Sequence, residues 1–215
     1  MGTQFMIIAV DGPLAAGKGT ISKALAEFYG LPHMDTGKLY RGVAYRLLSA
    51  GLSPQDAETA AKVARSLSMD GIEDADLRTA QVGAAASVVA ANQAVRQALF
   101  DLQRNFALQA GGAVLDGRDI GTVVCPEADV KLYVSASPEE RARRRQTELE
   151  ALGEVISFEA MLAQTLERDA RDSGRADAPL RPAEDSHLLD TTGLSIEAAV
   201  DKARLIVEQV RLAKS

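Results

Sequence analysis

A glycine-rich loop directly behind an apolar run constrains this chain of 215 residues more than any other feature. Residues 5–10 predict a β-strand, residues 12–20 read Gly-Pro-Leu-Ala-Ala-Gly-Lys-Gly-Thr, and a helical pattern begins at Lys18. Strand, loop and helix therefore follow one another in the order of a phosphate-binding loop. The glycines let backbone N–H groups turn inward, the helix N-terminus adds partial positive charge, and Lys18 supplies a cation. The sequence predicts that this loop holds a nucleoside triphosphate.

Two oxygen-bearing side chains near this loop are candidate ligands for Mg²⁺. Thr20 stands one place beyond the usual position, because Gly19 directly follows the loop lysine. Asp116 ends a second apolar run, an arrangement that commonly holds a magnesium-bound water beside the loop lysine. We expect Thr20 and Asp116 to hold the metal directly or through water.

Composition narrows the class of protein. With 24 basic and 30 acidic residues, the chain lacks the positive field that nucleic-acid-binding proteins use to neutralise a phosphate backbone. One cysteine, Cys125, excludes an internal disulfide, and two histidines argue against a zinc site. No window approaches about 18 consecutive apolar residues, the length of a membrane span. We expect a single cytoplasmic domain over residues 1–215, monomeric, that binds neither nucleic acid nor membrane.

Short β-rich runs alternate with long helical patterns, which predicts an α/β fold with a central parallel sheet covered by helices. The predicted strands lie at 5–10, 32–34, 113–116, 130–134 and 187–190. The predicted helices lie at 18–29, 37–50, 54–67, 75–109, 138–152, 158–171 and 196–213. Ser53, Ser137 and Ser195 are expected to cap the helices that follow them. Residues 172–185 are expected to form a loop that becomes ordered on ligand binding.

Two further strings follow predicted strands, at the edge of the sheet where open α/β folds bind their ligands. In the first, Thr36 at a helix start suits a phosphate or hydroxyl group, and Arg41 suits bidentate phosphate binding. The alternatives are an ordinary helix cap and a solvated surface charge. In the second, Arg118 and Asp119 place a cation and a carboxylate just after Asp116; the alternative is a local ion pair.

Seven arginines gather at the two ends of a helical excursion: Arg141, Arg143, Arg144, Arg145, Arg168, Arg171 and Arg175. Residues 146–167, which lie between the two groups, contain none. Acidic neighbours offer partners to many of them, and for Arg143 and Arg144 a solvated face is the interpretation. For the others we favour a lid over transferred phosphates, where cations stabilise the charge that develops on the oxygens.

Together these strings resemble the nucleoside monophosphate kinases, and most closely the bacterial cytidylate kinases, over nearly the whole chain. The strings Asp116-Gly-Arg-Asp-Ile-Gly-Thr122 and Glu167-Arg-Asp-Ala-Arg-Asp-Ser-Gly-Arg175 are the most specific to that family. The resemblance implies a three-layer P-loop kinase fold with a helical monophosphate-binding region at 36–110 and a short lid at 146–167. It also implies transfer of the γ-phosphoryl group of ATP, with Mg²⁺, to CMP and dCMP.

The same resemblance assigns roles to residues of this sequence. For ATP it implies Gly12, Pro13, Leu14, Ala15, Ala16, Gly17, Lys18, Gly19, Thr20 and Arg145. For CMP it implies Thr36, with Ser87, Arg96 and Asp119 on the base, Arg41, Arg118 and Arg168 on the phosphate, and Asp172 and Arg175 on the ribose. The catalytic set is Lys18, Arg118, Arg168 and Arg171. Taken alone, Ser87 and Arg96 would be a surface serine and a helix-end arginine.

The sequence departs from the family pattern in the connection between Leu67 and Asp76, which is shorter than usual, and in Lys38, where a small residue is common. An alternative function is a kinase of the same fold that acts on UMP, AMP or a small hydroxylated metabolite. A second alternative, from another class, is a nucleotide-dependent switch. Against the switch, the chain has no Asn-Lys-x-Asp string to read guanine, and the arginine groups would lack a purpose.

Overall fold

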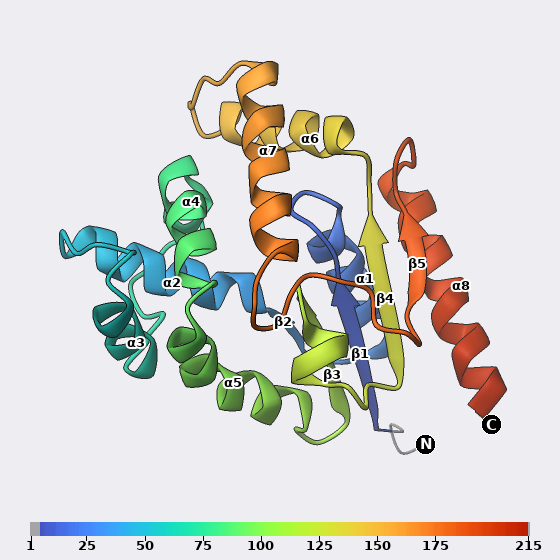
Figure 1. Ribbon diagram of the computed structural model, residues 1–215. Helices are drawn as coiled ribbons and strands as arrows, with labels where there is room; N and C mark the ends of the chain where they lie inside the picture. Colours follow the sequence, from blue (N-terminus) through green and yellow to red (C-terminus); the bar gives the residue numbers. More distant parts are fainter. Residues whose placement is uncertain (1–4, 215) are drawn as a thin grey trace.

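The apolar run before the glycine-rich loop forms the central strand of a five-stranded parallel sheet in the computed structural model, which describes residues 5–214 (Figure 1). The strands are β1 (Met6–Asp11), β2 (His33–Asp35), β3 (Gly112–Gly117), β4 (Val130–Ser135) and β5 (His187–Asp190). Their order in the sheet is β2-β3-β1-β4-β5, and all neighbours are parallel. The predicted α/β fold with a central parallel sheet is confirmed.

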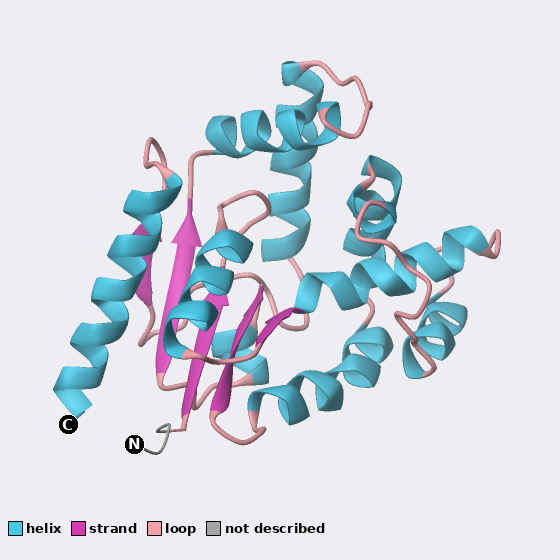
Figure 2. Cartoon of the chain, turned by 180° about the vertical axis from the view of Figure 1, so that it is seen from behind, coloured by secondary structure: helices cyan, strands magenta, loops and turns pink. Residues whose placement is uncertain are grey.

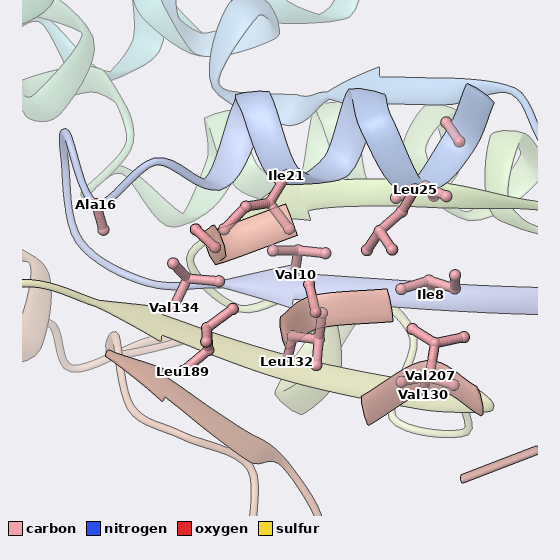
Figure 3. Packing of buried hydrophobic residues seen from close by; sticks show 14 of the residues in the cluster. Ile8, Val10, Ala16, Ile21, Leu25, Val130, Leu132, Val134, Leu189 and Val207 are labelled. Carbon is pink, nitrogen blue, oxygen red and sulfur yellow. The ribbon is translucent and has the colours of Figure 1, made fainter. Parts of the chain in front are cut away.

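Helices cover both faces of the sheet because the side chains of β1 alternate between them. Ile8 and Val10 pack with residues of α1 (Lys18–Tyr29) and α8 (Ile196–Lys214) (Figure 3), and Figure 2 shows helices over that face of the sheet. Ile7 and Ala9 belong to a second cluster, which also includes residues of α5 (Gln93–Ala107) and of η2 (Ile120–Val124), a five-residue π-helical turn. The two clusters make the sheet the middle layer of three and fix the carboxyl ends of its strands.

Two groups of helices lie beyond these layers (Figure 1). The first consists of α2 (Thr36–Ser49), α3 (Ala57–Arg65), the short 3₁₀ helix η1 (Asp76–Arg78) and α4 (Ala80–Val89). Buried residues of α2, α3 and α4 share an apolar cluster with α5. The second group, α6 (Pro138–Glu150) and α7 (Phe158–Ser173), has a small core that includes Ala142, Leu149 and Met161. Figure 1 shows α6 and α7 beyond the carboxyl ends of the strands.

The prediction of one helix over residues 75–109 is wrong, since this stretch forms η1, α4 and α5. Thr79 accepts a hydrogen bond from the backbone N–H of Val82 and so caps α4, and Asn92 caps α5 through the N–H groups of Ala94 and Val95. A cap by Ser53 is also wrong, because α3 begins at Ala57 behind Asp56. The caps by Ser137 and Ser195 are confirmed by hydrogen bonds from Glu140 and Ala198.

Among residues 5–214, no helix combines the length and the apolar character needed to cross a bilayer.

Candidate active site

A cavity of about 490 Å³ lies at the carboxyl ends of the strands. From the glycine-rich loop and the start of α1 it is lined by Leu14, Ala15, Gly17, Lys18, Gly19 and Thr20. From the residues expected to bind CMP it is lined by Thr36, Arg41, Arg96, Arg118, Asp119, Arg168, Asp172 and Arg175. Asp116 and Arg145 complete the predicted residues in the lining. The fold therefore brings the donor loop and most of the expected acceptor residues to one cavity.

The glycine-rich loop packs tightly against the sheet. At Gly12, where φ is 149°, an added Cβ would lie 1.9 Å from the carbonyl oxygen of Val134, so only glycine fits. Lys18 is 7% exposed and donates a hydrogen bond of 2.7 Å from Nζ to the carbonyl oxygen of Pro13. Burial lowers the pKa of Lys18 to about 7. Gly12, Pro13 and Ala16 support the loop without joining the cavity lining.

A buried carboxylate organises the arginines expected to bind the acceptor phosphate. Asp172 is 1% exposed and accepts hydrogen bonds from Arg118 Nε at 2.9 Å and from Arg175. Arg168 Nε lies 4.0 Å from the same carboxylate. Burial alone would raise the pKa of Asp172, but Arg118, Arg175 and Arg168 lower it below its usual range. Burial, followed by the charge of Arg118, lowers the pKa of Arg168 to about 9. One carboxylate thus holds three cations at the cavity wall.

Two of the three side chains expected on the base, Arg96 and Asp119, form an ion pair with each other. Arg96 on α5 is buried, donates a hydrogen bond to the Asp119 carboxylate, and has its NH1 atom 3.4 Å from the Tyr40 hydroxyl. A second carboxylate, that of Asp177, lies 3.7 Å from Arg96 Nε. Burial raises the pKa of Asp119. The guanidinium of Arg96 and the carboxylate of Asp119 therefore face one another at the wall of the cavity. The same cavity contains the arginines that surround Asp172.

Besides Gly12, Pro13 and Ala16, the predicted residues Ser87 and Arg171 are also absent from the cavity lining. Arg171 donates a hydrogen bond of 2.9 Å to the hydroxyl of Ser87 and also pairs with Glu167. Ser87 is buried on α4, so this contact joins α7 to α4 behind the lining. This hydrogen bond helps to hold the two helices together. Neither Arg171 nor Ser87 lines the cavity.

The residues expected to hold Mg²⁺ fit that ion. Asp116 Oδ2 lies 2.7 Å from His33 Nε2, and the Asp116 carbonyl accepts a hydrogen bond from the Thr36 hydroxyl at 2.8 Å. Thr20 and Asp116 both line the cavity, and among the described residues no cluster of three or more metal-ligating side chains forms a closed site. Mg²⁺ is usually held by one or two protein oxygens together with substrate phosphates and waters, which this sparse oxygen set suits.

The predicted lid contacts the acceptor region. It comprises the end of α6, a loop and the start of α7, and Glu154 in that loop accepts hydrogen bonds of 3.0 and 3.3 Å from the backbone N–H of Ala80. Arg145 donates a hydrogen bond of 2.8 Å to the carbonyl oxygen of Arg78. The first contact connects the lid to the start of α4, and the second connects α6, just before the lid, to the end of η1.

Several residues in the cavity lining were missed by sequence reasoning. Among them are His33, Tyr40 and Arg78, which carry no motif of their own. Lys38 also lines the cavity, and its amine pairs at 2.7 Å with Asp74 from the short connection between Leu67 and Asp76. His33 lies inside the predicted strand at 32–34 and is the first residue of β2, so its position along the strand did not mark it as a ligand-edge residue.

The fold recurs in solved structures of low sequence identity. A protein of unassigned character from Eubacterium ventriosum superposes with a TM-score of 0.56 at 15% identity, covering 96% of this chain and 99% of the other. A gluconokinase from Sinorhizobium meliloti superposes with a TM-score of 0.51 at 14% identity, covering 98% and 95%. At these identities the likeness concerns the fold alone.

Sequence relatives are far more similar. The profile of the family described as cytidylate kinase matches residues 8–210. A protein named cytidylate kinase from Methylobacterium sp. is 58% identical, covering 84% of this chain and 86% of its own. The cytidylate kinase from Methylocella silvestris is 54% identical, and the match covers 94% of each chain. That from Xanthobacter autotrophicus is also 54% identical, and the match covers 96% of this chain and 99% of the other. With a phosphate-binding loop and an arginine-rich cavity on the expected fold, this chain belongs to the cytidylate kinase family and is a phosphotransferase.

Proposed function

We propose that this kinase transfers the γ-phosphoryl group of MgATP in line to the phosphate of CMP or dCMP, giving ADP and the nucleoside diphosphate. The observation that supports this most directly is the composition of the cavity. The cavity contains the glycine-rich loop, the hydrogen-bonding pair Arg96 and Asp119, and the arginines around Asp172. A triphosphate and a nucleoside monophosphate need these three kinds of contact.

The chemistry asks for positioning and charge neutralisation rather than for a base, because the attacking phosphate oxygen is already anionic. Lys18 exchanges its hydrogen bond to the Pro13 carbonyl for the phosphates of the donor. Arg118 and Arg168 hold the acceptor phosphate and stabilise the charge that develops during transfer. Thr20 and Asp116 would hold Mg²⁺, which would supply further neutralisation of the charge on the donor phosphates. We also propose that the enzyme is monomeric.

Base selection follows from the Arg96–Asp119 pair. The carboxylate of Asp119 accepts from the exocyclic amino group of cytosine, and Arg96 donates to the ring acceptors. Uracil presents a carbonyl where cytosine presents the amino group, so two acceptors would face each other and a buried polar group would lose its partner. We therefore propose that CMP and dCMP are preferred over UMP.

The lid supplies the third part of the function. Closure of residues 146–167 over the phosphates excludes water and so limits wasteful hydrolysis of ATP. Arg145 lines the cavity beside the lid and is 7% exposed, and we assign this buried cation to the phosphates of the donor. Its hydrogen bond to the Arg78 carbonyl holds it there.

The test is ADP production from MgATP with CMP, dCMP, UMP, AMP or GMP at equal concentration, with products identified by chromatography. Conversion dominated by CMP and dCMP is the expected result. Dominant activity on UMP or AMP would assign the same fold to another acceptor. Slow ATP hydrolysis that rises with a protein partner, and no phosphorylated acceptor, would favour a nucleotide-dependent switch.

A variant separates catalysis from folding. Arg168→Ala removes a cation that is 4.0 Å from the Asp172 carboxylate, and turnover should fall much more than thermal stability. An equal loss of folding and activity would contradict the assignment of Arg168 to the transferred phosphate.

A further inference from the structure

A buried carboxylate outside the cavity lining connects the two halves of the site. Asp11 is the last residue of β1, directly before the glycine-rich loop, and is 5% exposed. Its Oδ1 accepts a hydrogen bond of 2.7 Å from the backbone N–H of Ile120, and its Oδ2 accepts one of 2.7 Å from Gly121. These two N–H groups directly follow Arg118 and Asp119.

We propose that Asp11 is a positioning residue that holds the segment carrying Arg118 and Asp119 in a fixed place relative to the donor loop. The inference rests on the proposed function, because it concerns how the acceptor is placed. Asp11 touches neither nucleotide and acts through the backbone of its partners. Acceptor binding should therefore depend on Asp11 more than donor binding does.

The chain path explains why such a tether is needed. β1 and β3 pair in register up to Asp11 and Gly117, so sheet hydrogen bonds fix the chain only as far as that point. Arg118 and Asp119 then leave the sheet before η2 begins at Ile120. The first N–H groups of a helical turn have no partner within the turn. The two oxygens of the Asp11 carboxylate accept hydrogen bonds from two of these N–H groups, those of Ile120 and Gly121. Asp11 thus fixes the carboxyl-terminal end of the Arg118–Asp119 segment.

The two accepted hydrogen bonds, one on each oxygen, make the side chain of Asp11 hard to replace. Burial raises the pKa of Asp11 to about 7, and the two backbone hydrogen bonds oppose that rise. An asparagine of the same size offers one acceptor and one NH₂ donor, so one of the two N–H groups would face a donor. Removing one partner of a buried hydrogen bond costs far more than the bond is worth on average.

Gly121 provides a second, independent way to disturb the same contact. A Cβ added at Gly121 would lie 3.3 Å from Asp11 Oδ2 and 3.1 Å from Cδ of Lys131, closer than most Cβ contacts. Gly121→Ala therefore keeps the Asp11 carboxylate but displaces its partner by a few tenths of an ångström.

The experiment measures KM for CMP, KM for ATP, kcat, and the ratio of kcat/KM for CMP over UMP in Asp11→Asn and Gly121→Ala. A matched control is Asp129→Asn, because Asp129 Oδ2 accepts a 2.8 Å hydrogen bond from Ile7 N at the opposite end of the same strand. We expect Asp11→Asn to raise KM for CMP on the order of tenfold, from the loss of a charged hydrogen bond, and to lower the CMP preference. Gly121→Ala should do the same to a smaller degree.

KM for ATP should stay within about twofold of wild type in both, and Asp129→Asn, whose amide oxygen can still accept from the N–H of Ile7, should change neither KM. Equal rises in KM for ATP and CMP in Asp11→Asn, or the same rises in Asp129→Asn, would show that Asp11 acts only on the fold. An unchanged KM for CMP in both variants of an active enzyme would refute the inference alone. A wild-type protein without activity on CMP would refute the proposed function, and the inference with it.

Discussion

Glu154→Ala removes one contact between the predicted lid and the acceptor region. Both oxygens of Glu154 accept from the N–H of Ala80, the first residue of α4. Loss of a side-chain acceptor at a helix start costs about 1 kcal/mol, and loss of a negative charge there costs a further 0.3–1 kcal/mol or so. A total of about 1–2 kcal/mol corresponds to a shift of roughly 5- to 30-fold from docked to undocked lid.

The assay is kcat/KM for CMP at saturating ATP, together with ATP hydrolysis in the absence of CMP. We expect kcat/KM to fall by about 5- to 30-fold, and the share of ATP lost to water to rise, because an undocked lid admits solvent. Glu150→Ala is the control, since Glu150 is an exposed carboxylate on the same excursion. A value of kcat/KM within about twofold of wild type in Glu154→Ala, or an equal fall in the control, would refute this reasoning.

Three further predictions concern the loop and the base-reading pair. Lys18→Met should melt at a higher temperature than wild type at pH 7 while losing turnover, because burial holds the pKa of Lys18 at about 7. Between pH 7 and about 10 the lysine of the unfolded chain keeps a proton that the folded chain has released, so the stability of the wild type rises with pH. The difference in melting temperature between variant and wild type should therefore shrink over this range. A variant that melts below wild type at pH 7 would contradict this. Gly12→Ala should destabilise the fold by about 1–3 kcal/mol in thermal unfolding, since its Cβ meets the Val134 carbonyl, and wild-type stability would refute the packing argument. Asp177→Asn should raise KM for CMP by about threefold and have no effect in an Arg96→Ala background; an equal effect there would mean that Asp177 acts elsewhere.

Local signals predicted the framework well. The glycine-rich loop and the apolar run before it are contiguous in the sequence, so the strand, the turn and α1 could be placed almost to the residue. The same holds for Ser137 and its helix, where a serine followed by proline marks the first turn. These features depend on residues that are neighbours along the chain.

The break between α4 and α5 shows where local signals end. Residues 75–109 contain neither proline nor a pair of glycines, so their alanine-rich pattern predicts one helix. The turn is made instead by Asn92, whose side chain caps α5 and also donates a hydrogen bond to the Ala57 carbonyl at the start of α3. That contact joins residues 35 positions apart, so the hydrophobic periodicity of α4 or α5 could not predict it.

The pairing of the charged groups was also beyond the sequence. Placement of Arg118, Arg168 and Asp172 near one another could be expected from the resemblance, but the partner of each charge could not. Asp116 pairs with His33 across two neighbouring strands, and Arg171 with Ser87 across two helices. Each of these contacts joins residues more than 80 apart, so only the folded chain selects them.

Several cations of the cavity already have anionic partners within the protein, and this affects which solutes can compete for them. Arg118 and Arg175 face Asp172, Arg96 faces Asp119, and Lys38 faces Asp74. A small oxyanion such as orthophosphate can replace only one of these carboxylates and leaves the rest in place, so it gains little over the pairs it disrupts. A nucleotide meets several at once. The cavity should therefore stay open to its substrate in solutions rich in inorganic phosphate, although its wall carries many positive charges.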